Sequence, residues 1–297
     1  MIDDDGRRAL REMLARPNRW VCKIQVAFRD LSAVSFGSGL LIGDRFVLTA
    51  AHVLMEPVRG SDGRFERAAD AAAVVVIPGL NGRGRRLIGA QASDTMPFGW
   101  THGTAFRASR VFRMAMRASG SQPRDLDYAL IQLATPIGAA RFAVLGNAPL
   151  GFWGYPAHGG QTRIRPKAAN TLKGVKVNAV GYPLDKCTDR PEGRTITEDE
   201  YNACRTADLG SVPWYSFDRI VSVGSGPFAA LELNNDAAPG MSGGPVWLRW
   251  QTVRNLIGVL HACDPVKSED SPFVGAIAAR ITDAVKRYLD AWMAEGA

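Results

Sequence analysis

Gly240-Met241-Ser242-Gly243-Gly244-Pro245 is the stretch of this chain that decides its fold and its chemistry. A hydroxyl is a poor nucleophile near neutral pH, so a reactive serine needs a base within hydrogen-bond reach and backbone N–H groups directed at the oxyanion it creates. The glycines around Ser242 allow the tight turn that this geometry requires. An ordinary Gly/Pro loop has the same composition, so the interpretation depends on partners elsewhere in the chain.

Both partners are present upstream. Thr49-Ala50-Ala51-His52 places a histidine after a hydrophobic stretch, residues 39–47, which predicts a hairpin that turns at Gly43-Asp44. Asp127 precedes the apolar run Tyr128–Leu133, and Asp125 lies two residues before it. A carboxylate at the start of such a strand can hold an imidazole tautomer and stabilise the imidazolium. The order histidine, aspartate, serine is one of three orders that unrelated folds use for this set.

On these motifs the chain resembles the chymotrypsin-fold (trypsin-like) serine proteases, and it is most similar to their bacterial glutamyl endopeptidase-like branch. The resemblance covers roughly residues 34 to 292. It implies an all-β fold of two packed antiparallel Greek-key β-barrels, with the active site between them. The matching stretches are Thr49–His52, Asp127–Leu130 and Gly240–Pro245, together with residues 77–82, 97–99 and 177–186, which point to the bacterial branch.

The resemblance also implies a role for each site residue. His52 is expected to act as general base and then as general acid, Asp127 to orient it, and Ser242 to attack the peptide carbonyl. The backbone N–H groups of Gly240 and Ser242 are expected to form the oxyanion hole. Asp125 is the rival for the acidic role, but Asp127 is preferred because the aromatic-Ala-Leu strand of the family pattern follows it directly. The expected function is a serine endopeptidase that works through an acyl-enzyme.

Two residues are candidates for substrate specificity. Glutamyl endopeptidases have a histidine two residues beyond a glycine on the strand after the serine, whereas His261 lies three residues beyond Gly258. Because adjacent strand residues face opposite sides, this offset either turns His261 away from the pocket or demands a bulge. Asp236 lies six residues before Ser242, where trypsins place the carboxylate that binds Arg or Lys. Acidic and basic specificity are therefore both left open.

Two further departures concern activation and access. Zymogen-activated trypsins have an aspartate before the catalytic serine, which captures a new N-terminus, whereas this chain has Met241. Activation by that ion pair is excluded. The stretch between His52 and Asp127 is also long, with its excess between Pro57 and Pro123. It can overhang the active-site cleft, but a surface elaboration is at least as well supported.

Composition bounds the location and the redox state. The chain has 297 residues, 46% of them hydrophobic, and 31 glycines, enough to bury a two-barrel core. No run of eighteen apolar residues predicts a membrane span, and the first residues lack the apolar segment of a secretory leader. We expect a cytoplasmic protein if Met1 is the native start and a secreted one if a leader was removed. Of the four cysteines, Cys187 and Cys204 bracket a polar loop and can pair in an oxidising compartment.

The net charge of +7 raises the question of a nucleic-acid partner. Residues 83–86 and the arginines of residues 107–117 supply the basic side chains, but no nucleic-acid-binding motif accompanies them. A solvated basic face is the favoured interpretation, so no nucleic acid is expected and the partner is a protein or peptide substrate. No metal or organic cofactor is expected, because the four histidines are isolated in sequence and no phosphate-binding loop is present. The sequence does not predict an oligomeric state.

The predicted organisation has four parts: an N-terminal helical extension (residues 1–20), a first barrel that carries histidine and aspartate (21–145), a second barrel that carries the serine (146–281), and a C-terminal helix (282–297). Within the extension, residues 3–16 read as a short helix that ends before Pro17, and Thr282 reads as the cap of the last helix. Predicted strands are residues 21–28, 38–42, 46–49, 73–77 and 128–133 in the first barrel, and 175–181, 218–223, 228–233, 245–248, 256–261 and 273–278 in the second.

Three alternatives remain at this point. The first is a catalytically silent or gated protease-fold module that binds a protein partner through the cleft between the barrels. The second is an HtrA-like quality-control protease, but too few residues follow Ser242 for a PDZ domain. The third is the regulatory processing of one dedicated protein. The presence of all three site residues in matching contexts favours an active enzyme over the binding module.

Overall fold

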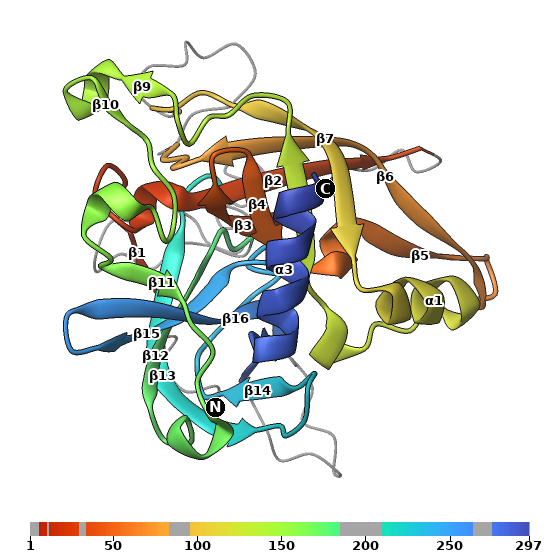
Figure 1. Ribbon diagram of the computed structural model, residues 1–297. Helices are drawn as coiled ribbons and strands as arrows, with labels where there is room; N and C mark the ends of the chain where they lie inside the picture. The colour runs from red at the N-terminus through yellow and green to blue at the C-terminus, as the bar shows by residue number, and fades with distance from the viewer. Residues whose placement is uncertain are drawn as a thin grey trace, which may run out of the picture.

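The computed structural model describes residues 6–10, 12–29, 34–82, 96–184, 210–263 and 275–296. The predicted pairing of Cys187 with Cys204 and the basic residues 83–86 lie outside the described residues. Within the described ranges the chain forms two antiparallel β-barrels, which lie one above the other in Figure 1. The fold predicted from the sequence is thereby confirmed.

The first barrel closes with six strands in the order β2-β3-β4-β8-β7-β6, and β6 pairs back with β2. All of these pairings are antiparallel, and β5 extends the sheet as a hairpin with β6. The alternating apolar residues of these strands fill the barrel interior. Its strands are β2 (Val21–Phe28), β3 (Val34–Gly43), β4 (Phe46–Thr49), β5 (Met55–Arg59), β6 (Phe65–Pro78), β7 (Thr101–Ala108) and β8 (Ala129–Leu133).

The second barrel closes in the same way, in the order β12-β15-β16-β17-β14-β13, with β13 pairing back to β12. A short strand, β11 (Thr162–Ile164), runs parallel to β16 at its edge. Between the barrels, β9 (Arg141–Phe142) and β10 (Ala148–Pro149) form a small hairpin. The six strands are β12 (Lys176–Gly181), β13 (Trp214–Val223), β14 (Ala230–Leu233), β15 (Pro245–Trp250), β16 (Val253–Cys263) and β17 (Ala276–Arg280).

The N-terminal segment differs from the prediction. A helix was expected over residues 3–16, but the described part contains no α-helix, and Arg8–Ala9 form strand β1. This strand pairs with Trp214 and Tyr215 of β13, and the Leu10 N–H donates to the carbonyl of Pro213 at 2.9 Å. An open sheet edge satisfies the backbone of this segment at once, whereas a short isolated helix is marginal.

Two α-helices are present among the described residues. α1 (Arg110–Ser119) was not predicted, whereas α3 (Asp283–Glu295) begins as expected at Thr282, whose hydroxyl accepts the Val285 N–H. Neither of them is long and apolar enough to cross a membrane. Single 3-10 turns are η1 (Asn18–Trp20), η2 (Ala51–Val53), η3 (Arg124–Leu126), η4 (Ala143–Leu145), η5 (Pro156–His158) and η6 (Ala169–Thr171).

α3 joins the barrels. It follows the last strand of the second barrel, β17, and lies across the front of the molecule in Figure 1. Trp292 stacks on Tyr128 of the first barrel with ring centroids 5.9 Å apart, and Glu295 accepts a hydrogen bond from Arg107 of β7 at 2.6 Å. These contacts fix the two barrels, and hence the two halves of the site, relative to each other.

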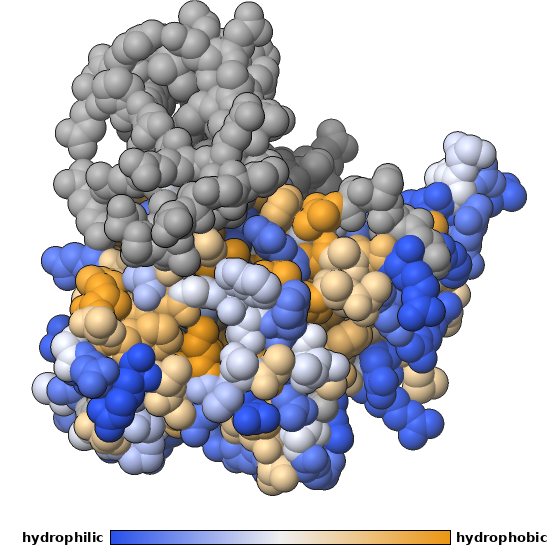
Figure 2. All heavy atoms as spheres, turned by 90° about the horizontal axis from the view of Figure 1, so that it is seen from above, coloured by the Kyte–Doolittle hydropathy of each residue, from blue (hydrophilic) through white to orange (hydrophobic). Residues whose placement is uncertain are grey.

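The apolar core is also shared between the barrels. One cluster fills the first barrel and continues into Tyr182 and Val259 of the second, while a smaller cluster fills the rest of the second barrel. On the surface, apolar residues lie in several separate groups between hydrophilic ones on the face seen from above (Figure 2). The barrels therefore form one packed unit around the junction where the candidate site lies.

Candidate active site

His52 and Asp127 are brought together by two neighbouring strands of the first barrel. β4 and β8 pair so that Thr49, the last residue of β4, lies opposite Ala129, the first residue of β8. The chain leaves β4 into η2, which carries His52, and it enters β8 from η3 through Asp127. The strand register therefore places the two side chains side by side, although they lie far apart in sequence.

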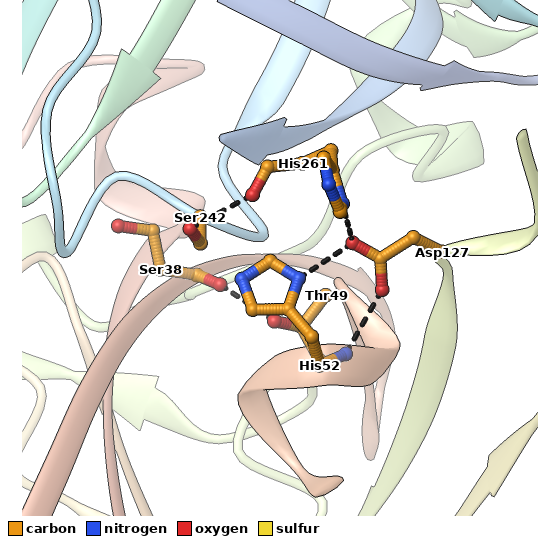
Figure 3. A network of polar contacts seen from close by, with 6 residues as sticks. All are labelled: Ser38, Thr49, His52, Asp127, Ser242 and His261. Atoms are coloured by element: carbon orange, nitrogen blue, oxygen red, sulfur yellow. Dashed lines mark hydrogen bonds and ion pairs between the residues drawn. The ribbon is translucent and has the colours of Figure 1, made fainter. Parts of the chain in front are cut away.

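Two hydrogen bonds hold His52 on Asp127. The His52 Nδ1 atom lies 2.5 Å from Asp127 Oδ2, and the backbone N–H of His52 donates to Asp127 Oδ1 at 2.9 Å (Figure 3). Asp127 has no exposed surface, whereas 18% of the His52 side chain is exposed. Nδ1 is thus committed to the carboxylate, and the other ring nitrogen faces the side on which Ser242 lies (Figure 3).

The charges of this pair shift both pKa values. Burial alone would lower the pKa of His52, but the charge and hydrogen bond of Asp127, together with the charge of Glu56, outweigh it and raise that pKa. Burial alone would raise the pKa of Asp127, but His52 and His261 outweigh it and hold that pKa far below the ordinary carboxyl value. Asp127 is therefore an anion at neutral pH, and His52 binds a proton more readily than a free imidazole.

Ser242 lies in the turn that leads into β15, on the second barrel. Its hydroxyl donates to the backbone carbonyl of His261 at 2.9 Å, and it makes no hydrogen bond with His52. The carbonyl of Ser242 accepts the N–H of Ser38, a residue of β3 in the first barrel, at 2.7 Å. The serine turn is therefore fastened to both barrels through its own backbone and through its side chain.

Two glycines of the motif have backbone conformations that only glycine adopts easily. Gly240 has φ +91° and Gly243 has φ +85°. A Cβ atom at Gly240 would collide with the carbonyl oxygen of Tyr182, and one at Gly243 would collide with Thr49 Oγ1 and the carbonyl of Ser38. The glycines predicted to allow a tight turn thus also allow the close approach of three neighbouring segments.

The N–H groups of Gly240 and Ser242 have no acceptor among the residues that the structure describes. The peptide plane before Gly240 is fixed, because the carbonyl of Pro239 accepts the Leu184 N–H at 2.8 Å. In a trans peptide the N–H points opposite to that carbonyl. Backbone N–H groups without an acceptor beside a serine hydroxyl are the donors from which an oxyanion hole is built.

Comparison with known proteins adds to this geometry. The family described as "Trypsin-like peptidase domain" matches residues 37–259, which include His52, Asp127 and Ser242. The chain belongs to the trypsin-like peptidase family. No curated protein matches it in sequence.

Solved structures share the fold of this trypsin-like peptidase. A Glu endopeptidase in complex with MPD superposes with a TM-score of 0.61 at 19% identity, with 99% of each chain covered. The protease Anisep from Arthrobacter nicotinovorans has a TM-score of 0.50 at 15% identity, with 93% of this chain and 96% of that chain covered. Both matches extend over nearly the whole molecule.

His261, the first candidate for substrate specificity, lies at a bulge of β16. The pairing of β16 with β17 shifts between Leu260 and Ala262, so that a bulge falls at His261. His261 Nδ1 makes a hydrogen bond with Asp127 Oδ2, and only 7% of the residue is exposed. The offset of His261 from Gly258 predicted either a bulge or a side chain turned away from the pocket. The sequence did not predict the contact of His261 with Asp127.

The other specificity candidate of the peptidase, Asp236, is exposed. Its Oδ2 atom accepts the backbone N–H of Gly6 at 2.7 Å, and its own N–H donates to Ser216 Oγ at 3.0 Å. One carboxylate oxygen of Asp236 is therefore without a hydrogen-bond partner among the described residues, although the residue is exposed.

Ser38 is a site residue of the peptidase that sequence reasoning missed. It is fully buried, its hydroxyl donates to the Gly240 carbonyl at 2.7 Å and accepts the Tyr182 N–H at 2.8 Å, and its carbonyl accepts the Thr49 hydroxyl at 2.7 Å. The available signal was a small polar residue between Gly37 and Gly39 inside an otherwise apolar strand. Glycine neighbours there mark close approach of another backbone.

One group of side chains could hold a metal ion among the described residues. It consists of His52, Asp127 and His261, whose ligand atoms lie within 4.8 Å of one another. Both Nδ1 atoms already hydrogen-bond to Asp127 Oδ2, and Asp127 Oδ1 accepts the His52 backbone N–H. The chemistry of this set is therefore that of a hydrogen-bonded base rather than that of a metal centre.

Proposed function

We propose that this trypsin-like peptidase is a serine endopeptidase in which Ser242 is the nucleophile, His52 the general base and Asp127 its orienting carboxylate. The observation that carries the proposal is the double hydrogen bond between His52 and the buried Asp127. It fixes the tautomer in which Nδ1 carries the proton and Nε2 is free to accept one. A histidine that served only as packing would not need an ionised, fully buried partner.

The reaction then proceeds in two transfers. The Ser242 hydroxyl leaves the carbonyl of His261, turns to His52 Nε2 and gives up its proton as Oγ attacks the substrate carbonyl carbon. The N–H groups of Gly240 and Ser242 stabilise the resulting oxyanion. Collapse of this intermediate breaks the C–N bond, and the leaving amine takes the proton from His52. Water repeats the sequence on the acyl-enzyme and releases the acid.

For specificity, the contacts favour a basic residue before the cleaved bond. The Nδ1 atom of His261 is occupied by Asp127, which disfavours its use for an acidic substrate side chain. Asp236 keeps a free carboxylate oxygen, and an Arg or Lys side chain pairs with such a group. The alternative is a preference for an acidic residue, as the name of the structurally similar Glu endopeptidase implies. An acidic substrate side chain would find His261 Nδ1 already bonded to Asp127.

The test is cleavage of a peptide library, with the residue before each cut identified by mass spectrometry. Ser242→Ala removes the nucleophile. Ser119→Ala is the matched control, because Ser119 is exposed on α1 and its hydroxyl donates to the Ala115 carbonyl of the same helix. We expect the wild type and Ser119→Ala to cut after Arg or Lys, and Ser242→Ala to be inactive. Cuts that persist in Ser242→Ala would refute the proposed nucleophile.

A second candidate function is a protease-fold module that binds a protein partner without cleaving it. The observation that favours it is the hydrogen bond of the Ser242 hydroxyl, which goes to the His261 carbonyl and not to His52. If this bond persists in the presence of substrate, the hydroxyl cannot give up its proton to the base. A wild type that binds library peptides, measured by fluorescence anisotropy, and leaves them intact would support this candidate instead.

A further inference from the structure

A cavity of about 300 Å³ lies beside the first turn of α3. Its walls come from three segments: residues 166–168 after β11, residues 226–227 between β13 and β14, and residues from 280 to 287 around the start of α3. In Figure 1 this region is the lower end of α3, beside β14. None of the residues that line the cavity belongs to the candidate active site. It is therefore a second place at which this protein can hold a ligand.

The lining of the cavity carries an excess of positive charge. Lys167, Arg280 and Arg287 are basic, and Asp283 is the one acidic residue, so three positive charges against one negative leave a net charge of +2. Neither arginine forms an ion pair within the part of the chain that the structure describes. Cations that surround a cavity without a counter-charge attract an anionic ligand.

Arg280 contributes most to this excess, because its guanidinium is buried. Only 7% of the residue is exposed. Its terminal N–H groups donate to the carbonyl of Gly224 at 3.1 Å and to that of Lys167 at 2.6 Å, while Nε has no hydrogen-bond partner among the described residues. A guanidinium has more N–H donors than these two bonds use. Burial lowers the pKa of Arg280, and the charge of Asp283 opposes that shift only in part, so an anion in the cavity would supply the missing counter-charge.

The start of α3 adds backbone donors to the same cavity. The N–H groups of Asp283 and Ala284 have no acceptor among the described residues, whereas the hydroxyl and carbonyl of Thr282 accept the next two N–H groups of the helix. Unpaired N–H groups at the positive end of a helix dipole favour an anion. Arg287 follows one turn later, is exposed and makes no hydrogen bond or ion pair with a described residue. Its guanidinium is therefore available to a ligand.

These donors suit a phosphate group better than a carboxylate. A phosphate carries about two negative charges at neutral pH, which match the net charge of the lining. Its tetrahedral oxygens accept donors from several directions, whereas a planar carboxylate is satisfied by one guanidinium. The cavity holds the volume of about ten waters, at roughly 30 Å³ each. It therefore leaves room for a small organic group beside the phosphate, between Pro166, Pro227 and Ala284.

We propose that the cavity between Arg280 and the start of α3 is a binding site for a phosphate group, either as inorganic phosphate or as the end of a small organic phosphomonoester. Arg280 and the first N–H groups of α3 bind the phosphate oxygens, and Arg287 binds them from the solvent side. Lys167, whose ammonium lies 4.9 Å from the centroid of the Trp250 ring, adds positive charge nearby. The inference does not depend on the proposed function, because no residue of the candidate active site takes part.

The first test is isothermal titration calorimetry on the Ser242→Ala protein, which lacks the proposed nucleophile and is therefore protected from self-cleavage. The probes are sodium phosphate and phenyl phosphate at constant ionic strength, with sodium acetate for comparison. We expect saturable binding of one phosphate per chain and none of acetate. Tighter binding of phenyl phosphate identifies an organic phosphomonoester as the ligand, and equal or weaker binding identifies the free ion. Titrations without saturation, or acetate that binds as tightly as phosphate, would overturn the proposal.

Arg287→Gln, made in the same protein, probes the cavity with little risk to the fold, because Arg287 makes no hydrogen bond with a described residue. It should weaken phosphate binding on the order of tenfold, since it removes a charge-assisted hydrogen bond. Lys286→Gln is the matched control. It removes the same charge from the next residue of α3, which pairs with Asp290 and does not line the cavity. Equal losses of affinity in the two variants would reduce the effect to net charge and contradict the site.

The second test locates the bound phosphate by NMR, with alanines labelled with nitrogen-15. The amide resonance of Ala284, assigned by its loss in Ala284→Gly, should shift with the same midpoint as the heat of binding. The resonance of Ala294, near the other end of α3, should stay in place. Phosphate should also raise the unfolding temperature, and raise it less once Arg287→Gln is introduced. An Ala284 amide that does not respond while the heat saturates would place the phosphate elsewhere and refute the proposed site.

Discussion

Ser38 and Gly240 lie on different barrels, and the Ser38 hydroxyl donates to the Gly240 carbonyl at 2.7 Å. The same hydroxyl accepts the Tyr182 N–H, so a single buried side chain joins β3 to the proposed oxyanion turn and to the end of β12. Since the proposed base belongs to the first barrel and the nucleophile to the second, this bond fixes the distance across which a proton must move.

Replacing Ser38 by Ala should therefore impair both activity and stability. The change leaves the Gly240 carbonyl and the Tyr182 N–H without a partner in a buried site, at a cost of about 1–3 kcal/mol in the free energy of unfolding. We also expect kcat to fall more than KM rises, because the turn is released. Urea unfolding and steady-state kinetics measure the two effects. A Ser38→Ala protein that is less stable but keeps the wild-type kcat would show that the hydrogen bonds of Ser38 contribute to the fold and not to catalysis.

Gly240→Ala should abolish most activity. Alanine at φ +91° is strained, and its Cβ would collide with the Tyr182 carbonyl, so the peptide that carries the Gly240 N–H must move. Losing one oxyanion donor typically lowers kcat by about 10²–10³. The matched control is Gly154→Ala, which has φ +89° but nothing within 4 Å of the new Cβ. The explanation fails if the two variants lose kcat equally, because strain at positive φ would then suffice.

The acid side of the pH profile should report His52. Its raised pKa means that kcat/KM falls, as the pH decreases, from a point above the ordinary imidazole pKa of about 6.5. The negative charge of Glu56 contributes to that increase, so Glu56→Gln should lower the pKa of His52 and extend activity to lower pH. Profiles of kcat/KM for both proteins test this. A profile that moves to higher pH in Glu56→Gln would contradict the sign of the effect.

Asp236→Asn should change which residue precedes the cut. The variant keeps the shape of the side chain and loses its charge, so kcat/KM for Arg and Lys substrates should fall at least about tenfold relative to that for apolar substrates. Asp218→Asn serves as the control, because Asp218 is a partly exposed carboxylate that hydrogen-bonds Asn234 on the surface of the second barrel. An unchanged cleavage pattern in Asp236→Asn would remove Asp236 from the specificity pocket.

Most barrel strands were predictable from the sequence because their apolar periodicity coincides with their burial, whereas β5 and β7 were not predicted. β2 and β4 have the predicted bounds, and β3 and β6 extend beyond the predicted cores. The N-terminal helix was predicted wrongly because the local helical spacing of Leu10, Met13 and Leu14 competes with a free edge on β13. Only the tertiary structure reveals that edge. The four-part division of the chain stays a prediction.

The sequence predicted those residues of the candidate site that lie in recognisable motifs. His52, Asp127 and Ser242 each lie in a short conspicuous stretch, and the strand register explains why the first two meet. His261 was predicted as a specificity residue and not as a partner of Asp127. Its spacing from Gly258 indicates a change in side-chain direction, but it does not show which residue the side chain then contacts. Ser38 carries no motif of its own, and its role depends on contacts more than a hundred residues away.

The central claim, that Ser242 is an activated nucleophile, is tested most directly by labelling with a fluorophosphonate, followed by intact-mass measurement and peptide mapping. The account predicts stoichiometric modification of Ser242 in the wild type, a rate that falls as His52 becomes protonated, and no labelling of His52→Ala under the same conditions. A wild type that stays unmodified, or that is labelled at another residue, would contradict it.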